Sequence, residues 1–523
     1  MRTAFAVGLL AAVAHGAEKP NKGMHRMVAK KNVRSVKHDR ARVSQHLKRL
    51  ANLAPSEELK TTILKELDSS TDTDYSEVTA KYGEPSTLDW IVDLYFDDSD
   101  DATATSVILD SGSSNLAVAV SSCTNCGKAA TDLDMTYASP EECIEVTYGS
   151  GEWFGYELAS HYVALSSSIS TDVTFAGITY QDEFFEGGDT YSGILGMAYD
   201  GIANGYSSST CDSEHGSSKR DFSSGESKPR RLHSGPRTAL KASSDETTDT
   251  PFMYALDESG AIEKNAFAFA VCDDDAKVSI GGVDESFYTG DISYAETQKT
   301  FGEYYGYYLV YMSGLEVDGS DVDLSDADVN KYGGVVVDTG TTLHYLPSSV
   351  VKTIETSVKD SVSSVSDSFF SWEACVSSDT ISSFPDVVYE FSTSSESDSD
   401  TFKITLKPEH YLLSYDSCYY WGFESSTLPI FGNIGMKDKM IVFDITENKM
   451  GFADGVCSDE SSVKLVAKSA EMIQTKSETN GSEFLLGIAS TLAVFGTIMA
   501  AVFIVKKHFP KTSDEEETET LLP

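Results

Sequence analysis

One short segment occurs twice in the chain, and this repeat limits the possible folds more than any other feature. Residues 107–114 read VILDSGSS and residues 335–342 read VVVDTGTT, so each is an apolar run ending in Asp, a hydroxyl residue, Gly and two more hydroxyl residues. Each is followed by a second apolar element closed by Gly, GILG at 193–196 and PIFG at 429–432. Such a repeat predicts two lobes built on one plan and related by a pseudo-twofold axis.

The segment between residue 70 and Cys457 reads as the body of the protein. It is rich in Val, Tyr, Phe, Ser, Thr and Gly, and its short alternating runs are separated by frequent turn signals, a pattern typical of β structure. We therefore expect an all-β, bilobal body at 76–457, with an N-lobe at about 76–255 and a C-lobe at about 256–457. Within it, residues 207–250 lack apolar periodicity and are expected to form a disordered insert. The KPRR run at 228–231 is either a protease site or a solvated charge cluster.

The two ends of the chain read as targeting segments. Residues 1–16 carry a positive charge at Arg2, then a short apolar run, and end in small residues, which predicts a signal peptide. A signal peptide directs the chain to an oxidising compartment. Residues 458–483 are a polar stalk with one glycosylation sequon, at Asn480. Residues 484–505 carry no charge and are long enough for a transmembrane helix, although a buried core helix is the alternative. Lysines follow at once, which places the tail at 506–523 in the cytoplasm and predicts a single-pass type I protein.

Charge is distributed unevenly. The chain carries a formal charge of −42, which argues against nucleic acid as a partner. Residues 17–67 contain 13 Lys or Arg and five Asp or Glu, about +8, so the rest carries about −50. A basic leader at 17–75, with helix formers at 45–53 and 57–67, is therefore expected to contact the acidic body, although a solvated basic tail is the other interpretation.

The two repeated Asp residues, Asp110 and Asp338, can supply a specific chemistry. An Asp at the end of a strand, just before a glycine turn, is held in a fixed position. The neighbouring hydroxyl groups can donate hydrogen bonds to its carboxylate oxygens. Two such carboxylates close together cannot both ionise easily, so they share one proton. One then acts as a base on water while the other donates a proton to a carbonyl, which hydrolyses an amide without a cofactor or metal. A single Asp-Gly turn would usually be structural, but two in matched settings favour catalysis.

The chain from about Leu88 to Cys457 resembles the pepsin-like aspartic proteases. The resemblance includes both Asp motifs, GILGMAY at 193–199 and IGGVD at 280–284. It also includes YGSG at 148–151, which is similar to the family's flap, and VFD at 442–444 with GFA at 451–453. Polypeptides are then the implied substrates, bound in extended form in a cleft between the lobes.

The resemblance also implies roles for individual residues. Asp110 and Asp338 would be catalytic. The expected substrate-binding residues are Gly112, Tyr148, Gly149, Gly340 and Thr341. Two positions depart from the family: Ser111 replaces the commoner Thr, and Ala117 replaces the tryptophan of pepsin, as in the membrane-anchored β-secretase branch.

The leader resembles the family's prosegment, which implies a zymogen inhibited by its own propeptide. The stretch VAKKNVR at 28–34 is similar to the segment whose lysine pairs with the catalytic aspartates, so either Lys30 or Lys31 is expected there. The leader would favour the ionised form of both aspartates, and acid would release it. Cutting is expected between about Leu67 and Ser86.

Eight cysteines can pair in an oxidising compartment. Resemblance to the β-secretase branch implies Cys272–Cys457 and Cys375–Cys418. The four cysteines that remain allow three pairings; they are Cys123, Cys126, Cys143 and Cys211. The CxxC spacing at 123–126 could also mark a metal or redox site, but no second pair and no nearby histidine accompanies it.

The tail contains ETETLL at 517–522, which resembles an acidic dileucine signal read by coat adaptors, or is a random acidic tail. The sequence thus predicts a membrane protein of the secretory pathway, in endosomes or lysosomes or at the cell surface. The main alternative to an aspartic endopeptidase is a non-catalytic binding or sorting receptor on the same fold, since fold alone does not settle function. An adhesion protein would explain the stalk and membrane helix but not the paired motifs.

Overall fold

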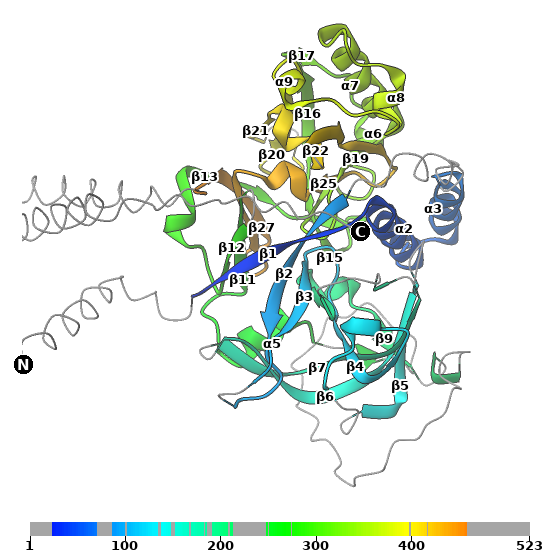
Figure 1. The fold of residues 1–523 in the computed structure, drawn as a ribbon, viewed down its shortest axis with the longest axis vertical. Helices are drawn as coiled ribbons and strands as arrows, with labels where there is room; N and C mark the ends of the chain where they lie inside the picture. Colours follow the sequence, from blue (N-terminus) through cyan, green and yellow to red (C-terminus); the bar gives the residue numbers. More distant parts are fainter. Residues whose placement is uncertain are drawn as a thin grey trace, which may run out of the picture. The chain divides into compact units, whose positions relative to one another are not determined.

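The computed structural model describes residues 24–70, 86–99, 102–133, 138–147, 152–166, 169–182, 184–185, 191–207, 210–212, 247–248, 250–272, 275–396, 399–415 and 417–457 (Figure 1). The chain divides into two units, Met1–Cys457 and Ser458–Pro523, and all of the described residues belong to the first. The predicted signal peptide, stalk, membrane helix and tail lie outside the described residues. Within the described ranges, no helix is both long enough and apolar enough to cross a membrane.

Most of the described body is β structure, as the sequence predicts. The largest sheet has 13 described strands. In spatial order they are β13 (Tyr288–Glu296), β27 (Lys449–Gly455), β26 (Lys439–Asp444), β11 (Ala266–Val271), β12 (Asp275–Ile280), β1 (His25–Ser35), β2 (Ser86–Leu94), β3 (Thr105–Asp110), β8 (Gly193–Gly196), β4 (Leu116–Thr124), β7 (Ile169–Asp182), β6 (Glu152–Ser166) and β5 (Ala138–Thr147).

Smaller sheets complete the C-terminal half. A second sheet contains β14 (Gln298–Thr300), β15 (Tyr304–Val310), β18 (Val335–Asp338), β25 (Ile430–Gly432), β19 (His344–Leu346) and β24 (Phe423–Ser425). A third contains β17 (Ser320–Asp321), β16 (Met312–Val317), β20 (Val387–Ser392) and β21 (Thr401–Leu406). Two strand pairs remain in the described residues, β9 (Gly205–Tyr206) with β10 (Thr247–Thr248) and β22 (Leu412–Tyr415) with β23 (Cys418–Trp421).

Helices are few in the described body and prominent in the leader. The leader forms α2 (Val36–Asn52) and α3 (Glu57–Ser70), which confirms the two predicted helical stretches. The body helices are α5 (Phe252–Glu258), α6 (Asp326–Val329), α7 (Ser348–Ser361), α8 (Asp367–Phe370) and α9 (Ser378–Ile381).

The repeated segments occupy equivalent places in two sheets. Strand β3 runs parallel to β8, with Asp110 opposite Gly196, and β18 runs parallel to β25, with Asp338 opposite Gly432. A third strand, β4 in one copy and β19 in the other, then pairs antiparallel with the glycine-bearing strand. The internal repeat seen in the sequence is therefore a repeat of strand topology, and each copy ends in an aspartate.

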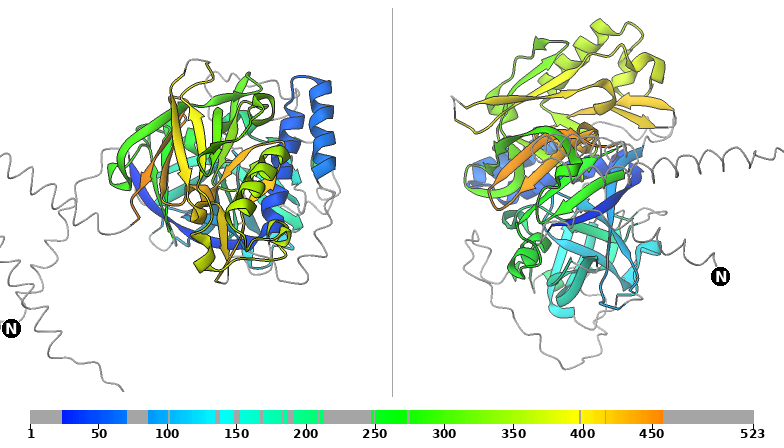
Figure 2. Two further views of the ribbon diagram at one scale, coloured as in Figure 1. Left: turned by 90° about the horizontal axis from the view of Figure 1, so that it is seen from above. Right: turned by 90° about the vertical axis from the view of Figure 1, so that its left-hand side faces the viewer.

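The leader is built into the body. Strand β1 lies between β12 and β2 and pairs antiparallel with both. Figures 1 and 2 show the helices α2 and α3 packed against the body beside strand β15 and the N-terminal half. Apolar side chains of both helices are fully buried, among them Leu47, Leu50 and Ile63. The expectation that leader and body are in contact is confirmed.

Lys30 lies away from the repeated aspartates. Its ammonium group pairs with Asp93 at 2.8 Å, and 64% of its side chain is exposed. Arg26 forms a second ion pair from β1, with the buried Asp284. The prediction that Lys30 pairs with the repeated aspartates is wrong, because the strand carrying it joins the sheet instead of entering the site.

Four disulfides join the eight cysteines. Cys272–Cys457 and Cys375–Cys418 are formed as the resemblance implies. The other two are Cys123–Cys126 and Cys143–Cys211. Most of the predicted insert at 207–250 lies outside the described residues, but its two ends are held by Cys211 and by the β9–β10 pair.

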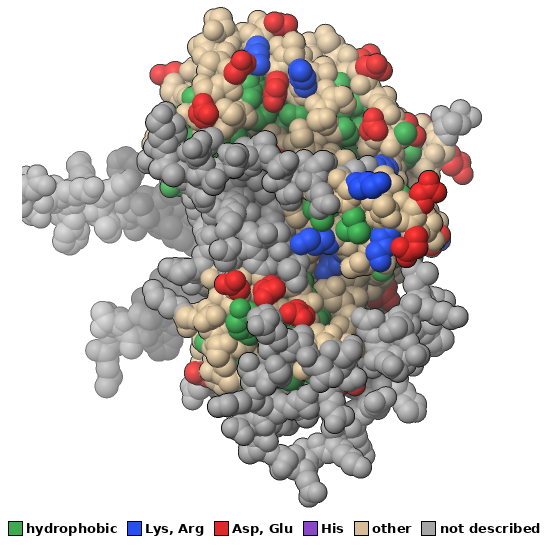
Figure 3. All heavy atoms as spheres, turned by 90° about the vertical axis from the view of Figure 1, so that its right-hand side faces the viewer, with side chains coloured by type: hydrophobic (Ala, Val, Ile, Leu, Met, Phe, Trp, Pro, Cys, Tyr) green, Lys and Arg blue, Asp and Glu red, His purple; other side chains and the backbone are tan. Residues whose placement is uncertain are grey.

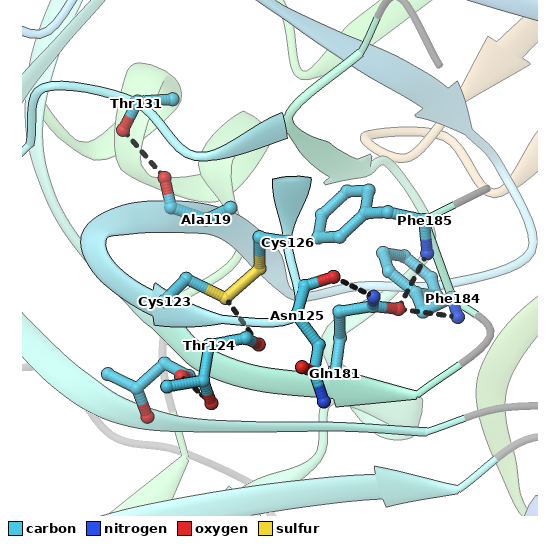
Figure 4. Close-up of a disulfide and its surroundings, with 10 residues drawn as sticks. Ala119, Cys123, Thr124, Asn125, Cys126, Thr131, Gln181, Phe184 and Phe185 are labelled. Atoms are coloured by element: carbon cyan, nitrogen blue, oxygen red, sulfur yellow. Dashed lines mark hydrogen bonds between the residues drawn. A yellow bond between two sulfur atoms is a disulfide. The ribbon is translucent and has the colours of Figure 1, made fainter. Parts of the chain in front are cut away.

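The CxxC sequence closes a short loop after β4 (Figure 4). Asn125 adopts a left-handed backbone with φ of 67°. Gln181 on β7 ties the loop to the chain beyond, since its amide donates to the Asn125 carbonyl at 2.5 Å and accepts from the backbone of Phe184 and Phe185. The pair therefore has a structural role in this loop, in line with the absence of a second cysteine pair or a histidine from the nearby sequence.

Candidate active site

Asp110 and Asp338 end equivalent strands and are both buried, with exposed fractions of 2% and 0%. The sequence places them there because each follows a run of three buried apolar residues, so the strand is fixed in the core up to the aspartate. The turn that follows then presents the carboxylate at the end of the sheet.

Each carboxylate is held by its own turn in the same way. Asp110 accepts from the Gly112 backbone N–H at 3.0 Å and from the Ser113 hydroxyl at 2.5 Å. Asp338 accepts from the Gly340 N–H at 2.9 Å and from the Thr341 hydroxyl at 2.6 Å. These hydrogen bonds favour the charged form of each carboxylate and fix its orientation.

The two turns are joined by reciprocal hydrogen bonds. The Ser111 N–H donates to the Thr339 hydroxyl at 3.0 Å, and the Thr339 N–H donates to the Ser111 hydroxyl at 2.9 Å. Each hydroxyl in turn donates to a carbonyl on the opposite copy, of Val337 and Leu109. Ser111 supplies the same hydroxyl as the commoner Thr, so this departure from the family costs no hydrogen bond.

Glycine is required in both turns because the copies approach so closely. A Cβ atom on Gly112 would lie 2.7 Å from a carboxylate oxygen of Asp338. One on Gly340 would overlap both the carboxylate of Asp110 and the guanidinium of Arg42. Each carboxylate thus faces the glycine of the other turn, which brings the two acids to one site.

Three basic side chains of leader helix α2 cover the pair. His46 Nε2 lies 3.0 Å from Asp338 Oδ2, inside a site where both side chains are almost fully buried. Arg49 donates to the Gly112 carbonyl at 3.4 Å. Arg42 is also buried, and its guanidinium lies beside Gly340.

The two acids differ in their electrostatics. Burial raises the pKa of Asp110 above its usual range, against the opposing charge of Arg42. Burial acts in the same sense on Asp338, but the hydrogen bond and charge of His46, with the charge of Arg42, outweigh it and hold the pKa of Asp338 well below its usual range. The charges of the leader residues Arg42 and His46 thus lower the pKa of both acids, and at Asp110 burial outweighs them.

The structure brings together most of the predicted site residues. Gly112, Gly340 and Thr341 lie in the turns beside the two aspartates. Tyr148 and Gly149 lie outside the described residues, as does the rest of the predicted flap tip. Ala117, where pepsin has tryptophan, is buried in an apolar cluster that also contains Trp153.

The leader residues at the site were not predicted from the sequence. The resemblance pointed to a lysine in an extended stretch, and Arg42, His46 and Arg49 lie in the helix that follows it. Part of the signal was present, since His46 and Arg49 fall on one face of the helix predicted at 45–53. The observed helix α2 begins earlier, at Val36, and carries Arg42 on the same face. A basic stripe on an otherwise amphipathic helix could have identified them.

Such an arrangement can activate water. It holds two carboxyl groups with opposite pKa shifts at one buried site, and amide hydrolysis by an acid and a base needs such a pair. Across the described residues, no cluster of side chains suited to a metal ion is found.

The fold and the site define an aspartic peptidase. The sequence profile of the eukaryotic aspartyl protease family matches residues 101–217 and 238–455, and the chain belongs to this family.

Individual relatives agree with the family. The chain is 25% identical to pepsin A of Sus scrofa over 364 residues, which are 66% of this chain and 77% of the pig protein. It is 30% identical to aspartic proteinase 36 of Arabidopsis thaliana over 216 residues, which are 38% of this chain and only 41% of the plant protein.

Proposed function

We propose that the chain is an endopeptidase that hydrolyses extended polypeptides with a water molecule activated between Asp110 and Asp338. The observation that carries this proposal is the matched hydrogen bonding of the two carboxylates, each by a glycine N–H and a hydroxyl of its own turn. A receptor that had lost catalysis would not need the same hydrogen bonds to both carboxylates.

The reaction follows from one proton shared by two acids. The charged carboxylate takes a proton from water while the oxygen attacks the peptide carbonyl carbon, and the protonated acid donates to the carbonyl oxygen. Collapse of the resulting tetrahedral species breaks the C–N bond, and the amine leaves with a proton from the pair. The reciprocal bonds of Ser111 and Thr339 keep the two acids in register during both proton transfers.

The leader contacts support a substrate-binding site beside the two turns. Arg49 donates to the Gly112 carbonyl, and a substrate backbone N–H would take the same acceptor once the leader has left. Because α2 covers both aspartates, we propose that the described state is inactive and that the protein is made as a zymogen.

Mild acid alone does not remove the charges that hold the leader. A lowered pKa at Asp338 means that its contribution to leader docking is present above its ordinary range and is lost only as pH falls through the lowered value. Asp93, the partner of Lys30, behaves in the same sense: burial raises its pKa, but the hydrogen bonds from Lys30 and Ser106 outweigh it. We therefore propose that activation needs a cut between α3 and β2, with acid as an aid.

The site of action follows from the targeting segments. The four disulfides suit an oxidising compartment. We propose that residues 484–505 anchor the protein and that the tail is read by coat adaptors. Retention of the full chain in membranes after alkaline extraction, and its loss when residues 484–523 are deleted, would test the anchor.

Peptide-library cleavage by the leader-free protein tests the function. We expect cleavage of peptides of about eight residues in extended form, and none by a matched Asp338→Asn protein prepared in the same way. A leader-free protein that binds peptides without cutting any would instead support the receptor.

A further inference from the structure

Figure 4 shows a short loop that follows β4 and is closed by the disulfide Cys123–Cys126. Its two cysteines are three residues apart in the sequence, whereas the other disulfides join cysteines that are 43, 68 and 185 residues apart. In the chain-entropy account, a disulfide stabilises a fold more when it closes a longer stretch of chain. Of the four bonds, this one can therefore be opened with the smallest loss of stability.

Access to the sulfur atoms also differs between the disulfides. Cys143 and Cys211 are buried, with exposed fractions of 0% and 2%, so their bond is shielded from solution. Cys123 is partly exposed, whereas Cys126 is only 3% exposed. A thiolate from solution would therefore attack Cys123, and Cys126 would leave. The two remaining disulfides also have an exposed or partly exposed cysteine, but they close the stretches of 43 and 185 residues.

We propose that Cys123–Cys126 is a thiol–disulfide exchange site for a small uncharged dithiol, and that opening this bond slows peptide cleavage. The effect on cleavage rests on the proposed function, whereas the exchange itself does not. The reduced loop has an acceptor for its new thiol, because Sγ of Cys123 lies 3.5 Å from the Thr124 carbonyl oxygen. Asn125 can then leave the left-handed conformation that it has in the closed ring.

The exchange runs in two balanced steps. A thiolate of the dithiol attacks Sγ of Cys123, the bond between the two cysteines breaks, and Cys126 leaves as a thiolate that takes up a proton. The second thiol of the reductant then attacks the reductant's own sulfur in the mixed disulfide, which releases Cys123 as a thiol and closes the reductant into a cyclic disulfide. Two electrons and two protons pass from the dithiol to the protein.

The charge around the loop selects the kind of reductant. Residues 116–135 and 176–190 include β4, the loop and the end of β7, and they contain two and four Asp or Glu against one Lys. Figure 3 shows Asp and Glu side chains over the lower half of the described surface, below the Lys and Arg side chains of its middle part. Like charge slows the approach of an anionic thiol such as glutathione, so an uncharged dithiol is the better reductant.

One buried side chain connects the loop to the chain beyond β7. Gln181 is 4% exposed, and its Nε2 donates to the Asn125 carbonyl at 2.5 Å. Its Oε1 accepts from the backbone N–H groups of Phe184 and Phe185 at 2.8 and 2.9 Å. If the Asn125 peptide turns away on reduction, the buried amide loses its acceptor, which is unfavourable. Rotation of the amide to find another acceptor would break the hydrogen bonds from Phe184 and Phe185.

The connection continues to the strand that carries Asp110. Gln181 lies opposite Trp153 in the pairing of β7 with β6, and the Trp153 ring packs edge-on against Phe184, with 6.5 Å between ring centroids. Trp153 and Phe184 lie in one buried apolar cluster with Ile108 of β3. Ile108 comes two residues before Asp110 on the same strand. Movement of Phe184 would therefore loosen the packing behind the strand that presents this carboxylate.

The test compares the wild-type protein with two variants. In Cys123→Ser with Cys126→Ser the loop is permanently open, and Gln181→Met keeps the disulfide but removes the amide that links it to Phe184 and Phe185. Full-length protein is treated with dilute dithiothreitol or with glutathione and then alkylated, and mass spectrometry maps the labelled cysteines. The other two measurements are hydrogen exchange of the Phe184 and Phe185 amides and cleavage of a quenched peptide by the leader-free enzyme.

We expect dithiothreitol to make Cys123 and Cys126 available for alkylation about 10-fold faster than the other cysteines, and glutathione at the same thiol concentration to act more slowly. Exchange of the Phe184 amide should rise about fivefold. The kcat/KM of the leader-free enzyme should fall about threefold, to the value of the serine variant, and reoxidation should restore it. Gln181→Met should show the same changes in exchange and cleavage without reductant, and should respond little to it.

Faster labelling of Cys375 or Cys418 than of Cys123 would overturn the exchange site, and faster reduction by glutathione would overturn the class of reductant. Unchanged amide exchange and kcat/KM in the open forms, with melting temperatures showing that they are folded, would overturn the effect on cleavage. If the serine variant does not fold, reversible reduction of the wild type supplies the same comparison. If no form cleaves peptides but labelling and amide exchange behave as expected, the proposed function is wrong and the exchange site stands.

Discussion

His344 should limit the stability of the fold in acid. Its ring is fully buried in the C-terminal half, stacked on Phe423 and edge-on to Phe431, with centroid distances of 5.1 Å to each. Nε2 donates to the His410 carbonyl at 3.2 Å. Within the described part of the chain Nδ1 has no hydrogen-bond partner, so a proton there would be a buried, unpaired charge.

The size of the effect follows from the pKa. Burial lowers the pKa of His344 from 6.5 to about 4. Between pH 6.5 and pH 4 the unfolded chain binds a proton at this histidine that the folded chain does not bind. The unfolding free energy therefore has its full value above pH 6.5 and falls as the pH drops towards 4. At pH 4 the loss of unfolding free energy amounts to about 3 kcal/mol, because lowering a pKa by one unit corresponds to about 1.36 kcal/mol. For a body of several hundred residues this corresponds to roughly 3 °C in Tm.

His344→Phe should remove this loss. The assay is thermal unfolding at pH 7 and pH 4, in an Asp110→Asn background that prevents self-cleavage. At pH 7 the variant should lose about 1 kcal/mol with the hydrogen bond, whereas at pH 4 it should be the more stable protein by about 2 kcal/mol. Tyr389→Phe is the control, because Tyr389 contacts the same ring and burial raises the pKa of its phenol further above neutral; it should shift Tm equally at both pH values. An identical pH dependence in wild type and His344→Phe would refute the reasoning.

Three further predictions concern the catalytic turns. Asp338→Asn or Asp110→Asn should lower kcat/KM of the leader-free enzyme by about 10³ or more with little change in Tm, and the double variant should lose little further, because the acids act as a unit; residual activity above one tenth in either single variant would contradict a shared mechanism. Thr339→Val should lower the unfolding free energy by roughly 2–4 kcal/mol, since it leaves the Ser111 N–H and a carbonyl unpaired, whereas Thr339→Ser should be nearly neutral in the same denaturant titration. Gly340→Ala should abolish peptide cleavage because its Cβ would overlap the Asp110 carboxylate, and circular dichroism should show that the fold survives; wild-type turnover would show that the turns separate more easily than the structure indicates.

The sequence predicted the fold and the pairing of the two aspartates because both depend on local pattern. Apolar runs ending in Asp, followed by Gly and hydroxyl residues, fix a strand, a turn and the groups that bind the carboxylate, and all of these are visible in a repeat. The pairing of Asp110 with Gly196 and of Asp338 with Gly432 follows from the same repeat.

The leader contacts could not be predicted in the same way. Which basic residue reaches the pair depends on how β1 pairs with two body strands and on where α2 begins, and neither is fixed by local propensity. Lys30 and His46 are both basic residues of one leader, but the sheet takes Lys30 to Asp93 while the helix takes His46 to Asp338. The disulfide between Cys143 and Cys211 is one of the three pairings that the sequence left open, because cysteine spacing alone does not determine which of them meet.

The proposed removal of the leader would have a consequence for the largest sheet, because strand β1 belongs to the leader. It pairs with β12 on one side and with β2 on the other, in the middle of the largest sheet. Its departure would expose the edges of β12 and β2, which the strand covers while the leader is in place. A chain without its leader would have to fold without the strand that joins β12 to β2. Its native state should therefore unfold slowly but should not refold readily after unfolding. The leader would serve as a template that is used once, and the working lifetime of the mature protein would be set by the rate of its first unfolding event.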